Sequence, residues 1–254
     1  MLKKLALMLV GCAVLITVPI PLSAQSDHSG YTIRRALVHP ARPEDDKAVD
    51  PFRRPLDVLL FAGLEPGMHV LDVNSGSGYY TEIMARVVGP DGRVYAHNGA
   101  VNWSFVKDAA ERRYRGPLLN VTPIHNGREE VDLPEASVDM LMIALAYHDY
   151  WFKHAARKEA EDIPAILASF HKALKPGGTL LVIDHVGKPR STAEDINQYH
   201  RVDPQMVRGQ LEAAGFIFAA KSDLLANPED NPLSSPYDPA RYGRTNRFIF
   251  KFTK

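Results

Sequence analysis

The chain has 254 residues, with 30 acidic and 30 basic side chains and a formal net charge of zero. Because the two signs are interspersed, this balance does not favour binding to nucleic acid or to an anionic membrane. Cys12 is the single cysteine and lies in the first apolar stretch, so the chain beyond it has no disulfide, no thiol nucleophile and no thiolate metal ligand.

Residues 1–24 predict a secretory signal peptide. Lys3 and Lys4 precede an apolar stretch over residues 5–18, and the segment ends in the small residue Ala24. This pattern is typical of a cleavable signal, and the mature chain would then be periplasmic or secreted, without an integral membrane domain. The apolar stretch is shorter than the roughly 20 residues that span a bilayer. Lipidation at Cys12 stays open as an alternative, but the apolar run continues beyond that cysteine.

The rest of the chain predicts one large domain. Residues 25–50 are polar and predict a partly ordered leader, and regular apolar periodicity over residues 51–254 alternates between strands and helices. Alternation of this kind indicates a doubly wound, mainly parallel sheet with helices on both faces. The expected strands are 69–73, 93–97, 121–125, 139–146, 179–184, 216–225 and 247–252, and the expected helices are 54–61, 79–88, 102–114, 163–174 and 203–214. Residues 227–244 predict a surface loop, with a lid as the alternative.

The most specific local signal follows the first expected strand. That strand ends near Asp72, a loop of small residues follows, and a helix begins after Gly78. Glycine lets a ligand approach the backbone closely, and a helix start presents unpaired N–H groups to it. A structural turn between strand and helix would also need glycine, so the loop alone does not decide between the two interpretations.

Several blocks in sequence order resemble the class I S-adenosylmethionine-dependent methyltransferases. Residues 72–78 resemble their Asp/Glu-x-Gly-x-Gly-x-Gly motif, and residues 64–72 resemble the lead-in to it. Residues 133–139 resemble the segment that enters their fourth strand, and residues 173–180 resemble the helix stop before their fifth. The resemblance implies a Rossmann-like, seven-stranded fold and methyl transfer from S-adenosyl-L-methionine to a small-molecule acceptor that the sequence does not name.

The resemblance also implies which residues bind the cofactor. Asparagine replaces a glycine or an acidic residue at three family positions, and its amide oxygen still accepts a hydrogen bond. Asn74 also tolerates the left-handed backbone conformation better than most non-glycine residues. Asn98 would face the ribose and Asn126 the adenine. The full implied cofactor set is Asp72, Asn74, Gly76, Gly78, Asn98 and Asn126.

Polar residues follow the fourth expected strand and end the fifth. Tyr147-His148-Asp149 and Asp184-His185 make the chain similar to a group of exported, predicted methyltransferases. Because these strands should be neighbours that end at one sheet edge, we expect the two polar pairs within about one bridging water of each other. His148, Asp149 and His185 are therefore candidate catalytic residues, as a base or as orienting groups for the acceptor.

An alternative hypothesis is a metal-dependent or ligand-binding exported protein on a degenerate methyltransferase scaffold. Histidine and carboxylate side chains at the expected strand ends suit zinc, iron or copper. No close His-x-His or His-x₃-His spacing supports a metal, so the sequence assigns no metal ligand, although a divalent ion stays open. The polar residues concerned are His97, His125, His148, Asp149, Asp184 and His185.

Overall fold

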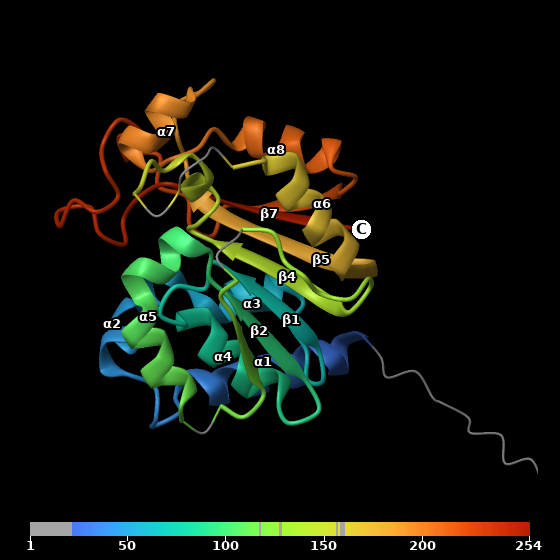
Figure 1. Ribbon diagram of the computed structural model, residues 1–254. Coiled ribbons are helices and arrows are strands. Elements are labelled where there is room, and N and C mark those ends of the chain that lie inside the picture. The colour runs from blue at the N-terminus through green and yellow to red at the C-terminus, as the bar shows by residue number, and fades with distance from the viewer. Residues whose placement is uncertain (1–21, 117, 127–128, 156, 158–160) are drawn as a thin grey trace, which may run out of the picture.

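A computed structural model describes residues 22–116, 118–126, 129–155, 157 and 161–254, which form one seven-stranded sheet between two layers of helices (Figure 1). The strand order is β3-β2-β1-β4-β5-β7-β6. The first five strands run parallel, and β7 is antiparallel to both of its neighbours. This confirms the predicted doubly wound, mainly parallel sheet. The strands are β1 (His69–Val73), β2 (Arg93–His97), β3 (Val121–Ile124), β4 (Val138–Ala144), β5 (Leu174–His185), β6 (Ile217–Ser222) and β7 (Arg247–Thr253).

Helices cover both faces of the sheet, with α6 and α8 on one side and α1, α3 and α4 on the other (Figure 1). The helix α8 begins where its sequence predicts, because the Asp203 side chain accepts a hydrogen bond from the Gln205 N–H and Pro204 fills the first helical position. The helices are α1 (Leu22–Leu37), α2 (Glu44–Arg53), α3 (Pro55–Ala62), α4 (Tyr79–Val88), α5 (Ala100–Tyr114), the 3₁₀ helix η1 (His148–Trp151), α6 (Ile163–Ala173), α7 (Ala193–Tyr199) and α8 (Pro204–Ala213).

Each face of the sheet carries its own apolar layer. Leu141 and Val182 pack with Phe170 of α6 on one face, and Met140 packs with Ile83 of α4 on the other, all of them buried. A strand that is covered on both faces needs apolar side chains in both directions, which explains the continuous apolar run of β4. Burial of each large side chain stabilises the fold by about 1.5–3 kcal/mol.

The segment before residue 51 is not separate from this domain. Ile33 and Ala36 of α1 are buried in the same apolar layer as α3 and α4. The leader expected over residues 25–50 is thus largely helical and packed, with no structural break at residue 50. Most of the predicted signal, residues 1–21, lies outside the described residues. Within the part of the chain that the structure describes, no helix is both long and apolar enough to span a membrane.

Candidate functional site

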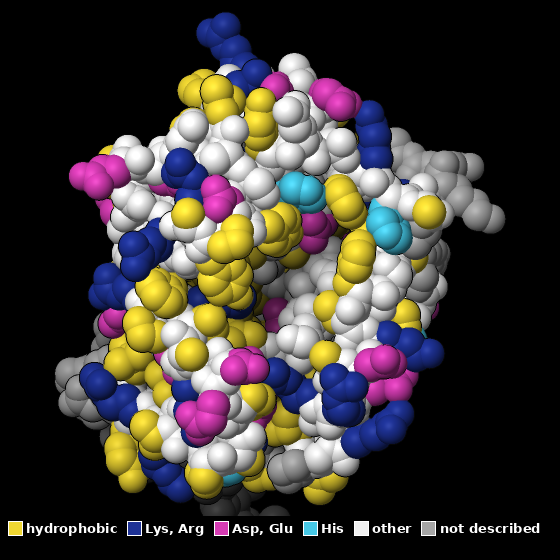
Figure 2. Space-filling model, turned by 90° about the vertical axis from the view of Figure 1, so that its left-hand side faces the viewer, with side chains coloured by type: hydrophobic (Ala, Val, Ile, Leu, Met, Phe, Trp, Pro, Cys, Tyr) yellow, Lys and Arg dark blue, Asp and Glu magenta, His cyan; other side chains and the backbone are white. Residues whose placement is uncertain are grey.

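A cavity of about 300 Å³ opens at the carboxyl ends of the central strands, within the range of small-ligand sites. Figure 2 looks onto this side of the molecule and shows the hollow, with hydrophobic side chains on its walls and charged ones nearby. The walls come from the β1–α4 loop, the end of β5, the end of α2 and the segment between β6 and β7. The lining includes Phe52, Arg53, Asn74, Gly76, Tyr79, Asn102, Asp149, His185, Tyr237, Tyr242 and Thr245.

The β1–α4 loop presents its backbone to this cavity at Gly76. Gly76 has a φ of 60°, and a Cβ added there would meet no atom within 4 Å. The turn is fixed by hydrogen bonds from the Ser75 N–H to the His97 carbonyl (2.9 Å) and from the Gly78 N–H to the Ser75 carbonyl (3.1 Å). Open space beside a left-handed glycine next to a helix start is the arrangement that a backbone-bound ligand needs.

Asn74 adopts the left-handed conformation expected of it, with a φ of 46°. Its amide nitrogen donates to a Glu129 carboxylate oxygen (2.9 Å), and its amide oxygen accepts from the Gly99 N–H (2.9 Å). Glu129 is buried, and this burial raises the pKa of its carboxyl, opposed by the Asn74 hydrogen bond and the Arg157 charge. No sequence motif marks Glu129, whose hydrogen bond joins the loop after β1 to the segment after β3.

Two of the predicted cofactor residues, Asn98 and Asn126, do not line the cavity. The Asn98 amide oxygen accepts from the Gly76 N–H (3.0 Å), and its amide nitrogen donates to the Ser75 hydroxyl (3.1 Å). Asn98 therefore stabilises the β1–α4 loop. It is buried and does not line the cavity, whereas Asn102 does. Asn126 is exposed, donates to the Glu130 carbonyl (3.3 Å) and is also outside the lining.

Asp72 and Gly78 support the loop without reaching the cavity. The Thr81 hydroxyl donates to the Asp72 carboxylate at 2.6 Å, and burial raises the pKa of Asp72 to about 7. A Cβ on Gly78 would lie 2.7 Å from the Tyr114 hydroxyl, so the loop packs tightly on α5 at this point. Of the six predicted cofactor residues, Asn74 and Gly76 therefore line the cavity.

The polar pair that follows β4, His148 and Asp149, and the pair that ends β5, Asp184 and His185, are in direct contact, which confirms the predicted proximity. The His148 ring nitrogen Nδ1 lies 2.8 Å from the Asp184 carboxylate, which also accepts from the backbone N–H groups of His148 (2.9 Å) and His185 (2.7 Å). Burial lowers the pKa of His148, but the carboxylates of Asp184 and Asp149 outweigh it and raise that pKa to about 9.

His185 and Asp149 bring this polar cluster to the cavity wall. The His185 ring nitrogen Nδ1 lies 2.8 Å from the Thr245 hydroxyl, and burial holds the pKa of His185 well below its ordinary value. His148 lies behind them and does not line the cavity. His148 and His185 still converge, since their ring centroids are 5.8 Å apart.

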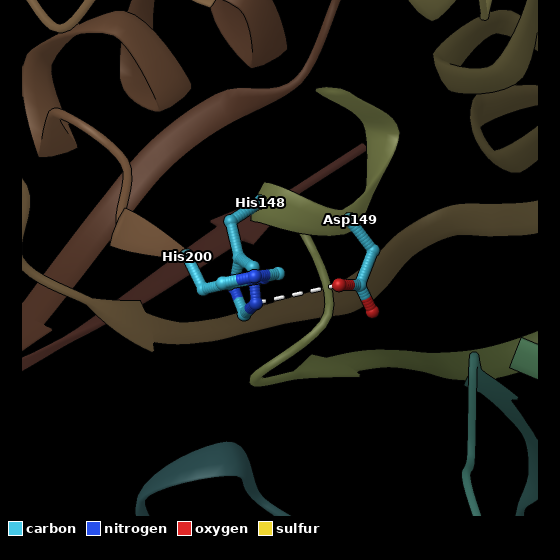
Figure 3. A group of neighbouring side chains, drawn as sticks. All are labelled: His148, Asp149 and His200. Carbon is cyan, nitrogen blue, oxygen red and sulfur yellow. Dashed lines mark ion pairs between the residues drawn. The ribbon is translucent and has the colours of Figure 1, made fainter. Parts of the chain in front are cut away.

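His200 joins this cluster, although no sequence pattern marked it. It follows α7 in a left-handed conformation, with a φ of 51°, and its ring packs on Tyr237 at 5.1 Å between centroids. Figure 3 shows His148, Asp149 and His200 pointing toward one another. Burial and the neighbouring His148 lower the pKa of His200 to about 4. Elsewhere, His125 stacks on Trp103 at 4.3 Å.

Comparisons of the sequence with known proteins find similar methyltransferases. Residues 55–114 match the family model described as protein-L-isoaspartate(D-aspartate) O-methyltransferase. A ubiquinone/menaquinone biosynthesis C-methyltransferase, UbiE, from Shewanella oneidensis is 32% identical over 178 residues, which cover 68% of this chain and 65% of that protein. UbiE of Shewanella pealeana is 29% identical over 191 residues, which cover 73% of this chain and 70% of that protein.

Solved structures share the fold. A SAM dependent methyltransferase from Aquifex aeolicus superposes with a TM-score of 0.57 at 24% identity, covering 83% of this chain and 97% of the other. A putative sarcosine dimethylglycine methyltransferase from Galdieria sulphuraria superposes with a TM-score of 0.56 at 14% identity, covering 83% of this chain and 87% of the other. At these identities the likeness concerns the arrangement of strands and helices.

Proposed function

Because this chain belongs to the class I S-adenosylmethionine-dependent methyltransferases, we propose that it binds S-adenosylmethionine in the cavity and transfers its methyl group to a small-molecule acceptor. The observation that carries the proposal is the open backbone of Gly76 at the start of α4, on the wall of that cavity. A tight turn that only connected β1 to α4 would not need an open backbone position beside a cavity of ligand size.

The residues on the cavity wall fit the chemical groups of this cofactor. Arg53 lines the cavity beside the loop, with its guanidinium 4.4 Å from the centre of the Tyr79 ring, and offers a cation to the carboxylate of the amino acid end. Asn102 offers a neutral amide to the ribose hydroxyls, in the role that the sequence suggested for Asn98. Asp72 and Gly78 hold the loop in shape, and Asn74 ties it to Glu129 in the segment after β3.

Bound S-adenosylmethionine supplies an electrophilic methyl group on a positively charged sulfur. The protein contributes alignment, which is the main requirement of an in-line transfer. His185 and Asp149 line the same cavity and provide hydrogen-bonding groups that orient the acceptor, while His148 holds this end in place through Asp184. The sequence predicts His148, Asp149 and His185 as a base or as orienting groups, and the orienting role is the one that we propose here.

A planar aromatic compound is the acceptor class that we favour. Aromatic side chains line the cavity: Phe52, Tyr79, Tyr237 and Tyr242. Such side chains bind a flat ring by stacking or edge contacts. The relatives UbiE are named ubiquinone/menaquinone biosynthesis C-methyltransferases. Quinones are planar rings, so these names support the same acceptor class.

Thermal unfolding with and without ligand tests the proposed function. S-adenosylmethionine and S-adenosylhomocysteine, each at about 100 times its dissociation constant, should stabilise the protein by about 2.7 kcal/mol. The melting temperature should rise in proportion to the logarithm of ligand concentration above that point. Adenosine alone, which lacks the amino acid end, serves as the matched ligand control and should stabilise less. A melting temperature that neither ligand moves would contradict the proposal.

We also propose that the protein is exported and cleaved after Ala24. The basic start, the apolar stretch and the small-residue exit support this. The cut would fall within α1, which starts at Leu22, and would remove the first three residues of that helix. Mass spectrometry of the protein from its native cell should find Gln25 as the first residue. A lipid-modified Cys12, or an intact Met1 on cytosolic protein, would contradict this.

A further inference from the structure

We propose that His148, Asp149 and His200 bind a divalent transition-metal ion, zinc or iron(II), at the acceptor end of the cavity. One ligand atom from each of the three side chains can be chosen so that all lie within 4.8 Å of one another. Figure 3 shows the three converging, two from η1 and one from the turn after α7. Two histidines and one carboxylate are a donor set that both ions accept, with further coordination positions left open.

The spacing approaches that of a loaded site. Metal–ligand bonds to zinc are about 2.0–2.2 Å long, so two ligands of one tetrahedral ion are about 3.3–3.6 Å apart. Nε2 of His148 is already 3.3 Å from the Asp149 carboxylate, whereas separations of up to 4.8 Å within the cluster would have to shorten by up to about 1.5 Å. His148 is fixed by its neighbours, whereas the Asp149 side chain is 24% exposed and has room to rotate toward an ion.

The second observation is the way His148 is held. Asp184 lies 2.8 Å from its Nδ1 and is itself fixed by two backbone N–H groups, so the carboxylate orients the ring and directs Nε2 toward Asp149 and His200. Metal-binding histidines almost always carry such a carboxylate or carbonyl on the other ring nitrogen. Among the described residues, Nε2 of His148 has no hydrogen-bond partner although it is buried, and its nearest carboxylate oxygen, on Asp149, is 3.3 Å away.

His200 also has a buried ring nitrogen without a hydrogen bond among the described residues. Its Nδ1 is buried without a hydrogen-bond partner in the described part of the chain. It ends α7 in a left-handed conformation, and the next residue, Arg201, is held by an ion pair with Asp230 at 2.7 Å. These contacts fix the backbone that places His200 beside His148, with their ring centroids 5.6 Å apart.

The position of the cluster suggests what the ion would do. Asp149 belongs both to the cluster and to the cavity wall, so open coordination positions would be reached from the acceptor end. The ligand class is then a small molecule with an oxygen donor, such as a phenol, held by the ion as a Lewis acid. This role rests on the proposed function, but metal binding does not and can be measured without any cofactor.

Metal titration of the full chain, purified with a histidine-free tag and stripped with a chelator, tests the proposal. Isothermal titration with Zn²⁺ should show one equivalent bound, and Co²⁺ should give the visible absorption of a nitrogen- and oxygen-ligated ion. The His200→Gln variant should bind Zn²⁺ at least about 10-fold more weakly and lose the Co²⁺ spectrum, and Asp184→Asn should weaken binding about 10- to 100-fold. His69→Gln, at the opposite end of the sheet, is the matched control and should bind as the unmodified chain does.

The outcomes separate this proposal from the proposed function. His200→Gln should still be stabilised by S-adenosylhomocysteine, which also shows that the variant is folded. If the unmodified chain binds no zinc at stoichiometric amounts, or if His200→Gln binds it as well as the control does, the metal site is wrong. In that case an imidazolium of His148 between two carboxylates accounts for the cluster. Failure of S-adenosylhomocysteine to bind any variant would instead contradict the methyltransferase assignment and leave the zinc result standing.

Discussion

Replacing Gly76 with valine is expected to abolish binding of S-adenosylmethionine while the protein remains folded. The residue has a left-handed backbone, and its added side chain would project into open space on the wall of the cavity. The branched side chain would keep the ligand from the loop backbone, and the affinity should fall at least about 100-fold, which corresponds to about 2.7 kcal/mol. Isothermal titration with S-adenosylhomocysteine measures the loss.

Gly177 offers a matched control for this substitution. It also has a left-handed backbone, with a φ of 74°, and a Cβ there would again meet nothing within 4 Å, but it lies in the first part of β5, outside the cavity lining. Both valine variants should lose a similar stability, about 1–2 kcal/mol, from backbone strain. Gly177→Val should bind normally. Normal binding by Gly76→Val would show that the loop is not the cofactor site.

Replacing Arg201 with methionine is expected to destabilise the protein by about 3–5 kcal/mol, the usual cost of removing one partner of a buried ion pair. The guanidinium pairs with Asp230 at 2.7 Å, and the two side chains are 1% and 2% exposed. It also donates to the carbonyls of Ser234 (2.7 Å) and Val186 (3.3 Å). Loss of this group would leave a buried carboxylate short of its main countercharge and would detach the segment that carries Tyr237.

Urea denaturation of the variant and of a control measures this effect. Arg208→Met removes an exposed ion pair with Glu212, whose side chains are 40% and 42% exposed, and should cost no more than about 1 kcal/mol. The double variant Arg201→Met with Asp230→Leu should recover much of the stability, because the unpaired charge is gone. A loss below about 1 kcal/mol in Arg201→Met would mean that the pair does not anchor this segment.

The strands and most helices could be predicted because their signals are local. An uninterrupted apolar run marks β4, and a small-residue loop between an apolar strand and a helix marks the end of β1. The helix α7 was missed, since it is only 7 residues long and buries Ile196 alone, although Thr192 and Asp195 form a capping box. The buried positions of α1 were missed because polar residues surround them.

The polar cluster could be predicted only in part. His148, Asp149, Asp184 and His185 follow adjacent parallel strands, so topology alone brings them together. His200 lies in a different segment, the turn after α7. Its position depends on contacts between distant residues, such as the pairing of Arg201 with Asp230, which no local sequence pattern predicts. The same holds for the aromatic residues between β6 and β7, where the sequence suggested an inert loop and the structure shows a cavity wall.

The role of Asn98 could not be predicted from the sequence for a different reason. An amide can bind a ligand hydroxyl or a backbone group with the same two atoms, and sequence position does not choose between them. Here the Gly76 N–H and the Ser75 hydroxyl take both ends of the amide. Asparagine in place of an acidic residue is thus explained by the loop, which needs a donor as well as an acceptor.

The place of β7 in the sheet sets an order for biosynthesis. β7 lies between β5 and β6, although both precede it in the chain, and β6 has no other strand partner among the described residues. While a ribosome or a translocation channel still holds residues 247–253, the seven-residue ladder of β5 that will pair with β7 remains an open edge. Open edges of this kind recruit other chains. Until β7 emerges, the nascent chain therefore depends on a chaperone, or on its own low concentration, to keep that edge from pairing with a neighbour.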